Sequence, residues 1–306
     1  MTAAPRSSDD PSSDGPPPDT PSATSSPSRT LRIELAYDGG DYAGWQIQPG
    51  QPTVQAALEA SFAELAGQRV PVVGSGRTDA GVHALAQVAS CRTTLALPCR
   101  DIARALNARL PDDIIVRQVS DAPADFSALH SAKRKRYAYL IHNRPLGDVF
   151  LRRYAWHVHA PLDLEAMQRA AGAFLGTHDF SSFESSGSPR ASSVRTIDEL
   201  TVSPTPHPFA AWAGSTGASR PFAALADEAL ICISVSADGF LYNMVRAIVG
   251  TLVEVGRGAE CADWPAQVVA ATDRSQAGPT APPQGLFLVG VEYDGQDDYD
   301  DQDLEA

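Results

Sequence analysis

Between residues 31 and 293, segments with the two-residue alternation of strands are interleaved with segments that carry a helical apolar stripe. The strongest helix is predicted over 240–255, since its apolar residues recur on one face: Leu241, Met244, Val245, Ile248, Val249 and Leu252. Such a chain must bury sheet faces against helices. Neither a dinucleotide-binding nor a P-loop glycine pattern occurs. We therefore expect an α+β fold with a largely antiparallel sheet.

The remaining elements follow from the same two periods and from residues that begin or end helices. Strands are predicted over 31–37, 70–73, 86–93, 114–119, 137–141, 194–202, 229–237 and 287–293. Helices are predicted from the N-cap Thr53 to Gly67, over 101–110, and over 164–175, where Gly176 ends the helix. Gly256 is predicted to end the helix over 240–255. Residues 203–228, rich in Pro, Gly and Ala, predict a long loop insertion.

Both ends of the chain differ in composition from this body. Residues 1–29 contain 15 Ser or Pro and no Leu, Ile, Val or Phe, and residues 294–306 contain six Asp and one Glu. Neither segment can bury enough apolar area to offset its ordering entropy, so both are predicted to be disordered tails. The net charge of −13 excludes a uniformly basic surface. Because the tails carry most of that charge, a local basic strip on the body stays open.

The sequence disfavours several classes of protein. The four cysteines show no C-x-x-C spacing, so neither a structural zinc site nor a disulfide framework is expected. No secretory signal is found, and the longest apolar stretch is broken by Arg246 and Glu254 before it could span a membrane. We expect a soluble, cytoplasmic protein without a metal site, in which His157, His159 and His178 are structural.

The segment 74–84 is the most unusual part of the chain. Three glycines between residues 74 and 81 permit positive φ and close backbone approach, and they surround one cation, Arg77, and one carboxylate, Asp79. The residues alone allow two interpretations: a hairpin with an Asx turn at Asp79, or a carboxylate on a rigid loop, kept ionised by Arg77. A phosphate-binding loop is excluded, because no Lys-Ser/Thr pair follows the glycines.

Residues 76–84, Gly-Arg-Thr-Asp-Ala-Gly-Val-His-Ala, resemble the catalytic motif of the tRNA pseudouridine synthase A family. Further blocks match at the family's spacing: Ala-Tyr-Asp-Gly at 36–39 with Gly-Trp-Gln at 44–46, Arg-Tyr-Ala-Tyr at 136–139, His-Asp-Phe at 178–180, and Phe-Leu-Tyr-Asn-Met-Val-Arg at 240–246. The resemblance covers about residues 31–293.

This resemblance implies an isomerase that converts uridine in RNA into its C-glycoside isomer, pseudouridine. The N1–C1′ bond breaks, the detached uracil rotates, and C5 joins C1′. The reaction is redox-neutral, so the resemblance implies no metal, nucleotide or organic cofactor. It also implies that Asp79 is the catalytic carboxylate. The sequence leaves open whether Asp79 attacks C1′, attacks the ring or removes the C2′ proton.

Further site residues are implied by their positions in the matching blocks. Tyr137 matches the active-site tyrosine, whose ring can stack on a flipped uracil and whose hydroxyl can relay a proton. Arg246 matches the basic residue that pairs with the catalytic carboxylate, and Arg77 matches the residue that helps to flip the target base. His83 is expected only to pack or to bond the loop backbone.

A basic run, Lys133, Arg134, Lys135 and Arg136, directly precedes Tyr137 and holds both lysines of the chain. Its position favours contacts with RNA phosphates, which position RNA without reading its sequence. The alternative is an ordinary solvated face.

The resemblance implies the pseudouridine synthase fold, with one half over 30–130, a second over 131–293, and the active-site cleft between their joined sheets. Family members are homodimers that hold one tRNA across both subunits. The expected substrate is the anticodon stem-loop of tRNA, at uridines 38–40, recognised by shape and backbone rather than by base edges.

Three alternative functions are weaker. A non-catalytic tRNA-binding or chaperone protein would need a missing carboxylate or arginine, yet Asp79 and Arg246 are both present. A synthase directed to another RNA site is disfavoured by the intact blocks, although the loops 39–52 and 203–228 could retarget it. A hydrolase with paired carboxylates lacks a second acid in a comparable motif.

Overall fold

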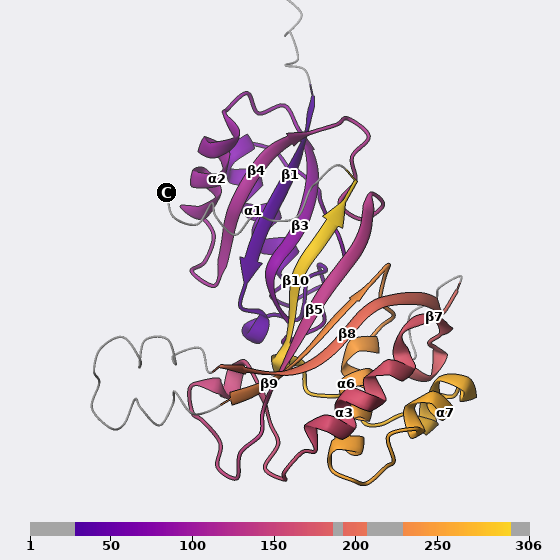
Figure 1. Ribbon diagram of the computed structural model, residues 1–306. Coiled ribbons are helices and arrows are strands. Elements are labelled where there is room, and N and C mark those ends of the chain that lie inside the picture. Colours follow the sequence, from indigo (N-terminus) through magenta and orange to yellow (C-terminus); the bar gives the residue numbers. More distant parts are fainter. Residues whose placement is uncertain (1–27, 186–191, 207–228, 295–306) are drawn as a thin grey trace, which may run out of the picture.

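A computed structural model describes residues 28–185, 192–206 and 229–294 (Figure 1). The strands are β1 (Arg29–Tyr37), β2 (Val72–Gly74), β3 (His83–Thr93), β4 (Ile114–Ala122), β5 (Ala132–His142), β6 (Trp156–His157), β7 (Gly176–Asp179), β8 (Val194–Pro206), β9 (Ala229–Ala237) and β10 (Leu286–Tyr293). The α-helices are α1 (Val54–Ala66), α2 (Cys99–Asn107), α3 (Leu164–Ala171), α6 (Met244–Gly256) and α7 (Trp264–Ala271). Short 3₁₀ helices are η1 (Gly39–Asp41), η2 (Leu151–Arg153), η3 (Gly172–Phe174), η4 (Ser181–Phe183), η5 (Arg274–Gln276) and η6 (Pro283–Gly285).

All described strands belong to one sheet. Its order is β4-β1-β3-β10-β5-β9-β8-β7, with β2 paired to β3 and β6 paired to β5. The pairs β10–β3 and β5–β6 are parallel, and the other described pairs are antiparallel. The expected α+β class with a mainly antiparallel sheet is confirmed.

The helices gather at the two ends of this sheet. In Figure 1, α1 and α2 accompany β1, β3 and β4, whereas α3, α6 and α7 accompany β7 and β8. The ends of α1 follow the sequence: the Thr53 hydroxyl accepts from Ala56 N at 3.4 Å, and Gly67 ends the helix with φ of 68°. Buried apolar side chains from both ends form one continuous cluster. The two ends are therefore packed as one body.

The strand β10 joins the two ends. It pairs in parallel with β3 through Phe287 opposite His83 and Leu288 opposite Ala84, and it pairs antiparallel with β5 on its other edge. The last described strand of the chain thus lies between strands from its beginning and its middle. The turn before β3 is brought to the same region as Tyr137 on β5.

The helix predicted over 240–255 begins later than expected. Asn243 has φ of 62°, in the left-handed region, so residues 240–243 form a loop and α6 starts at Met244. The apolar stripe alone could not reveal this, because Leu241 is also buried. At the other end, α6 continues through Gly256, and the positive φ falls instead at Gly258.

Other boundaries also differ from those predicted. The expected loop 203–228 begins later, since residues 203–206 belong to β8; residues 207–228 lie outside the described residues. The strand β1 already includes Arg29, whose guanidinium binds Asp121 at 2.6 Å. The helix α7 was not predicted, because eight residues are too short to display a clear stripe.

Gly250 provides a test of how closely α6 approaches the segment 277–282. A Cβ at Gly250 would overlap the carbonyl oxygen of Pro279, whereas a Cβ at the exposed Gly172 would meet open space. We expect Gly250→Ala to lower the free energy of unfolding by about 1–3 kcal/mol or more, as overpacking does. Gly172→Ala should leave it unchanged or raise it by about 0.4–1 kcal/mol. Urea denaturation measures both, and equal midpoints would contradict the close approach.

Candidate active site

The loop between β2 and β3 carries Asp79 and is tied down at both ends. Ser75 N donates to Val88 O at 2.7 Å, and Val82 N donates to Asp79 O at 3.1 Å, which closes a turn. Gly81 adopts φ of 77° in that turn, a conformation that favours glycine. Asp79 therefore stands on a backbone of fixed shape.

A second loop, residues 42–52, packs against this turn. Trp45 N donates to Thr78 O at 3.0 Å, and Gly81 N donates to Tyr42 O at 3.3 Å. Gly44 has φ of 98°, and a Cβ there would lie 2.5 Å from Thr78 O. The Gly-Trp pair of the sequence thus allows a backbone-to-backbone approach that supports the loop of Asp79.

Asp79 faces Arg246, which lies on the first turn of α6. Arg246 Nη1 lies 3.8 Å from Asp79 Oδ2, and the two side chains are 16% and 28% exposed. Burial raises the pKa of the Asp79 carboxyl above its ordinary value, and the charge of Arg246 opposes that rise. The ion pair that the sequence predicted is present. In this surrounding, the desolvation of the carboxylate outweighs the attraction.

Arg246 is held by groups other than Asp79. Its Nε donates to Ala281 O at 2.7 Å, and its Nη1 donates to Asn243 Oδ1 at 2.7 Å. Asn243 in turn donates to Ser185 Oγ at 3.0 Å. Burial lowers the pKa of Arg246, while the charge of Asp79 raises it. The left-handed backbone at Asn243 therefore places an acceptor beside the guanidinium.

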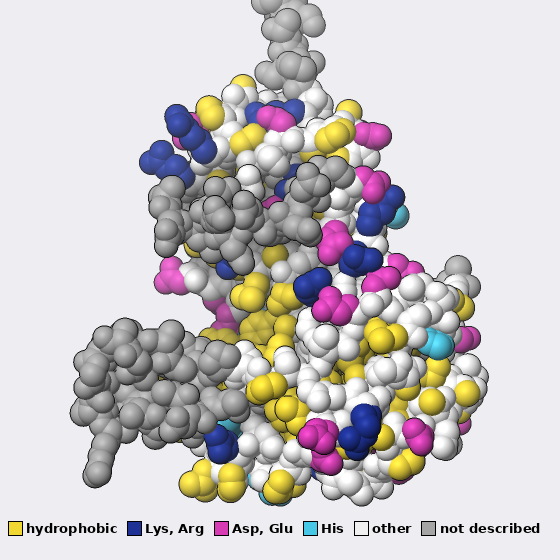
Figure 2. Space-filling model, in the orientation of Figure 1, with side chains coloured by type: hydrophobic (Ala, Val, Ile, Leu, Met, Phe, Trp, Pro, Cys, Tyr) yellow, Lys and Arg dark blue, Asp and Glu magenta, His cyan; other side chains and the backbone are white. Residues whose placement is uncertain are grey.

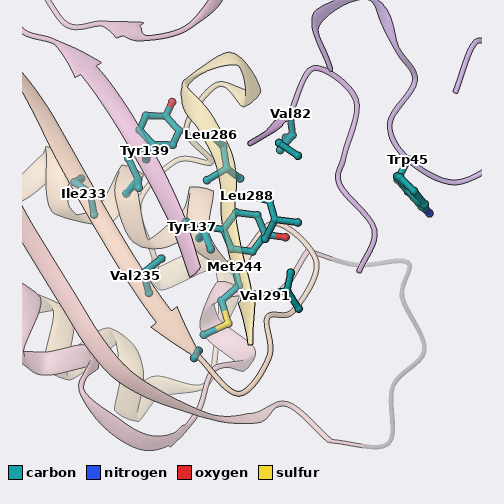
Figure 3. Packing of buried hydrophobic residues seen from close by; sticks show 14 of the residues in the cluster. Trp45, Val82, Tyr137, Tyr139, Ile233, Val235, Met244, Leu286, Leu288 and Val291 are labelled. Atoms are coloured by element: carbon teal, nitrogen blue, oxygen red, sulfur yellow. The ribbon is translucent and has the colours of Figure 1, made fainter. Parts of the chain in front are cut away.

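Tyr137 lies on β5 and is almost completely buried. Its ring packs edge-on against Phe240 with centroids 5.1 Å apart. In Figure 3 the ring lies beside Leu288 and Met244, and its hydroxyl points away from β5. Burial raises the pKa of Tyr137, and the neighbouring Tyr37 and Asp79 raise it further. The phenol thus keeps its proton near neutral pH.

These groups share a cleft of about 1150 Å³. Its lining comes from the loop of Asp79, the loop 43–51, β5 and the loop before α6. Its positively charged lining residues are Arg77, Lys135, Arg195 and Arg246; the negatively charged ones are Asp79 and Asp238. Asp238 Oδ1 accepts from Thr196 N at 3.1 Å, so it also has a structural bond. Asp79 is the carboxylate that lies beside Tyr137 and Arg246.

The basic run is divided between the two faces of β5. Lys135 lines the cleft together with Tyr137, whereas Arg134 binds Asp198 at 3.0 Å and Arg136 binds Glu199 at 3.3 Å. Lys133 binds Asp294 at 2.9 Å, beside a different cavity. The structure therefore brings Lys135 alone of the four residues to the cleft.

Basic and acidic side chains are also interspersed on the face of the molecule that is drawn in Figure 2.

Arg77 and His83 differ in their surroundings although both belong to the motif. Arg77 lines the cleft, is exposed, and has no hydrogen bond or ion pair within the described residues. His83 is buried: its Nδ1 accepts from Gly39 N at 3.1 Å, its Nε2 lies 3.0 Å from Arg153 O, and its ring stacks on Phe287. His83 thus bonds to backbone outside its own loop, and its Nδ1 also lies 3.0 Å from Asp38 Oδ1.

Arg195 was not singled out from the sequence, because one arginine in a strand pattern carries no signal. It lies on β8, lines the cleft, and donates to the backbone carbonyls of Ser192 and Val194. The amides Gln46, Gln48 and Gln51 also line the cleft and were missed for the same reason. Only the placement of β8 and of the loop 43–51 in space could have identified them.

Two further observations concern the described part of the chain. No three His, Cys, Asp or Glu side chains there lie close enough together to hold a metal ion. None of the helices described there combines the length and apolar character that crossing a membrane requires. His178 and His157 lie 2.8 Å from backbone carbonyls, those of Leu175 and Arg144.

The arrangement suits chemistry on a nucleotide unit. A cleft of about 1150 Å³ holds one carboxylate between an arginine and a buried aromatic ring. Burial strengthens the interaction of that carboxylate with a bound molecule, because water screens it less. Aromatic rings stack on bases, and cations at the rim attract phosphates. These features are those expected of a cleft that binds a nucleotide next to a carboxylate.

Comparisons with known proteins identify the family. The family model for tRNA pseudouridine synthase matches residues 35–129 and 170–294. The chain is 43% identical over 265 residues to tRNA pseudouridine synthase A of Thermoanaerobacter sp. (strain X514), covering 87% of this chain and 100% of that protein. It is 44% identical over 265 residues to tRNA pseudouridine synthase A of Moorella thermoacetica, covering 86% and 99%. The chain therefore belongs to the tRNA pseudouridine synthase family and is an isomerase, as the sequence blocks predicted.

Among solved structures, a chain of a Cbf5-Nop10-Gar1 complex aligns with a TM-score of 0.30 and 11% identity, over 73% of this chain and 54% of that chain. This likeness is too weak to carry any argument.

The raised pKa of Asp79 predicts how stability depends on pH. When a carboxyl has a higher pKa in the folded state than in the unfolded state, the folded protein loses stability as the pH rises from the unfolded pKa through the folded pKa. Asp79→Asn, which carries no charge, should therefore raise Tm at pH 7, and this gain should vanish as the pH falls below the ordinary carboxyl pKa. Thermal melts between pH 3 and pH 7 measure the difference.

Asp179 is the matched control, because hydrogen bonds from Ser181 and Ser193 lower its pKa. Its stabilisation is present above its unfolded pKa and lost as pH falls, so Asp179→Asn should lower Tm at pH 7. If both variants changed Tm in the same direction at pH 7, burial would not be what governs the pKa of Asp79.

Proposed function

We propose that this protein converts uridines 38–40 in the anticodon stem-loop of tRNA into pseudouridine, with Asp79 as the catalytic carboxylate. The observation that carries the proposal is the position of Asp79, 3.8 Å from Arg246 in the cleft that Tyr137 also lines. The relatives that match over most of the chain are named tRNA pseudouridine synthase A, which supports tRNA as the substrate.

In the proposed reaction the N1–C1′ bond of the target uridine breaks and the freed uracil rotates. A bond forms between C5 and C1′, the proton on C5 leaves, and N1 gains a proton, so the product is an isomer. Asp79 acts on the nucleoside as an ionised carboxylate, and Arg246 favours that ionised form. The ring of Tyr137 supports the uracil by stacking, which contributes about 1–3 kcal/mol for base stacking in general.

The target base must leave its helical stack before it can reach a buried carboxylate. Arg77 is suited to that step, because it lies at the cleft, is exposed, and has no partner within the described residues. Its guanidinium can take the place vacated by the base without breaking an existing ion pair. Arg77 thus acts on the RNA, and Arg246 acts on Asp79.

The RNA backbone is proposed to enter between Lys135 and Arg195, the other two cations of the cleft. We further propose a cytoplasmic homodimer that holds one tRNA across both subunits, following the family resemblance in the sequence. Recognition of backbone and shape fits a cleft that Lys135 and Arg195 both line.

The direct test uses tRNA labelled with tritium at C5 of uridine, since the reaction releases that atom. The wild-type protein should release tritium from tRNA that has uridine at positions 38–40, and not from tRNA with cytidine there. Asp79→Asn should reduce the release at least about 1000-fold, as loss of a catalytic group does, and should bind the same tRNA within about twofold. Binding without release by the wild type would favour a non-catalytic tRNA-binding protein. Release from the cytidine variant would place the target elsewhere.

The two faces of β5 allow a matched test of RNA binding. Lys135→Ala removes a cation from the cleft, and Arg136→Ala removes one from the opposite face, where Glu199 already pairs with it. Lys135→Ala should weaken tRNA binding and reduce the slope of log K against log salt by about 1. Arg136→Ala should change neither. Titrations at three salt concentrations measure both slopes, and equal effects of the two variants would count against RNA in this cleft.

A further inference from the structure

Four polar side chains, two in the loop of Asp79 and two on the strands beneath it, form one hydrogen-bonded group. This group, the subloop network, consists of Tyr37 from β1, Gln87 from β3, and Ser75 and Thr78 from the loop. Tyr37 and Thr78 are each 5% exposed, and Ser75 and Gln87 are fully buried. Buried polar groups lower stability unless they are bonded, so each contact in this group carries weight.

Gln87 is the centre of the network. Its Oε1 accepts from Ser75 Oγ at 2.7 Å, and its Nε2 donates to Gly76 O at 3.1 Å and to Tyr37 Oη at 3.3 Å. One side chain of β3 thus binds the loop at two successive residues. Because the carbonyl oxygen of Gly76 can only accept, the bond to it fixes which end of the amide is nitrogen.

Tyr37 extends the network to the residue before Asp79. Its hydroxyl lies 2.8 Å from Thr78 Oγ1. Because Tyr37 Oη accepts from Gln87, its own proton is available for Thr78. Burial raises the pKa of Tyr37 to about 12, so the proton stays in place near neutral pH.

Tyr37 and Gln87 lie on the same side of the sheet, because Gln87 pairs with Leu35, which is two residues from Tyr37 on β1. The pairing is irregular just beyond this point: Tyr37 pairs with Ala84, so two steps along β1 match three along β3. The extra residue reverses the side-chain alternation of β3, and such bulges often lie beside active sites. Without it, Ala84 and Gln87 would face opposite sides.

We propose that Tyr37 and Gln87 are positioning residues for catalysis, which hold residues 75–78 so that the Asp79 carboxylate meets the reacting nucleoside beside Arg246. This proposal rests on the proposed function. Every hydrogen bond of these two side chains ends on the loop or on another member of the network. Apolar side chains at the same two positions could pack β1 against β3 without these hydrogen bonds. The network therefore serves the loop rather than the sheet.

Catalytic geometry is sensitive to such support, because a displacement of about 1 Å can reduce a rate by about 100-fold. Tyr37→Phe removes the hydroxyl and keeps the ring that packs on Trp45. Thr78→Val removes the same hydrogen bond from its other end. Tyr293→Phe is the matched control, since the hydroxyl of the buried Tyr293 on β10 also donates a hydrogen bond, to Ala128 O at 2.8 Å, but lies outside the network and the loops of the cleft.

The experiment measures three quantities on the full chain: single-turnover rate at saturating tRNA, KM, and hydrogen exchange of residues 75–82 by mass spectrometry. We expect Tyr37→Phe and Thr78→Val each to lower the rate about tenfold or more, with KM within about twofold, and to speed exchange in this segment. The double variant should be no slower than the slower single variant, because both remove one bond. Tyr293→Phe should keep the wild-type rate and exchange.

Each other result overturns one of the proposals. A wild-type rate in Tyr37→Phe, or an equal loss in Tyr293→Phe, would show that the network has only a structural role. Additive losses in the double variant would show that Tyr37 does not act through Thr78. If the wild type forms no pseudouridine, the proposed function fails. The exchange comparison then still decides whether the network holds the loop: unchanged exchange in Tyr37→Phe overturns that part.

Discussion

The pairing of β10 between β3 and β5 is the constraint on which the site depends. Across these three strands, Ala84, Leu288 and Tyr137 lie directly opposite one another. Neighbouring strands are about 4.8 Å apart, and β10 lies between β3 and β5. Tyr137 on β5 therefore lies about 10 Å across the sheet from β3, the strand that follows the loop of Asp79. The loop can therefore reach back over the sheet and share a cleft with Tyr137. A register shift of one residue would turn Tyr137 to the other face of the sheet.

The same alternation decides which basic side chains can serve the cleft. Lys135 and Tyr137 are two residues apart on β5 and face the same side, whereas Arg134 and Arg136 face the other side and bind Asp198 and Glu199. Three of the four cations in this run are thus paired with acids, two on β8 and one just after β10. The cleft instead gains Arg195 from β8, more than fifty residues further along the chain.

Much of the fold could be predicted from the sequence because local periodicity reflects local burial. The cap at Thr53 and the stop at Gly67 correspond to the ends of α1. The alternation over 31–37 corresponds to β1, but both faces of that strand are buried, with Arg32 and Glu34 paired to each other. The start of α6 could not be predicted, since Asn243, which has the left-handed backbone there, bonds to Ser185 in a distant segment. The motif blocks indicated Asp79, Tyr137 and Arg246. The subloop network and Arg195 depend on sheet register, which no single segment encodes.

The way in which Arg246 is held suits the catalytic role proposed for Asp79. A carboxylate in a close, two-pronged ion pair has its oxygens occupied by hydrogen bonds. Here the guanidinium donates to the neutral oxygens of Ala281 and Asn243, so its direction does not depend on Asp79. It stays 3.8 Å from the carboxylate, and within the described residues the Asp79 side chain accepts no hydrogen bond. The charge of Arg246 thus favours the ionised form, while the oxygens remain available to a bound nucleoside. Burying this carboxylate lowers the stability of the fold, and the same arrangement leaves its oxygens free to contact a bound nucleoside.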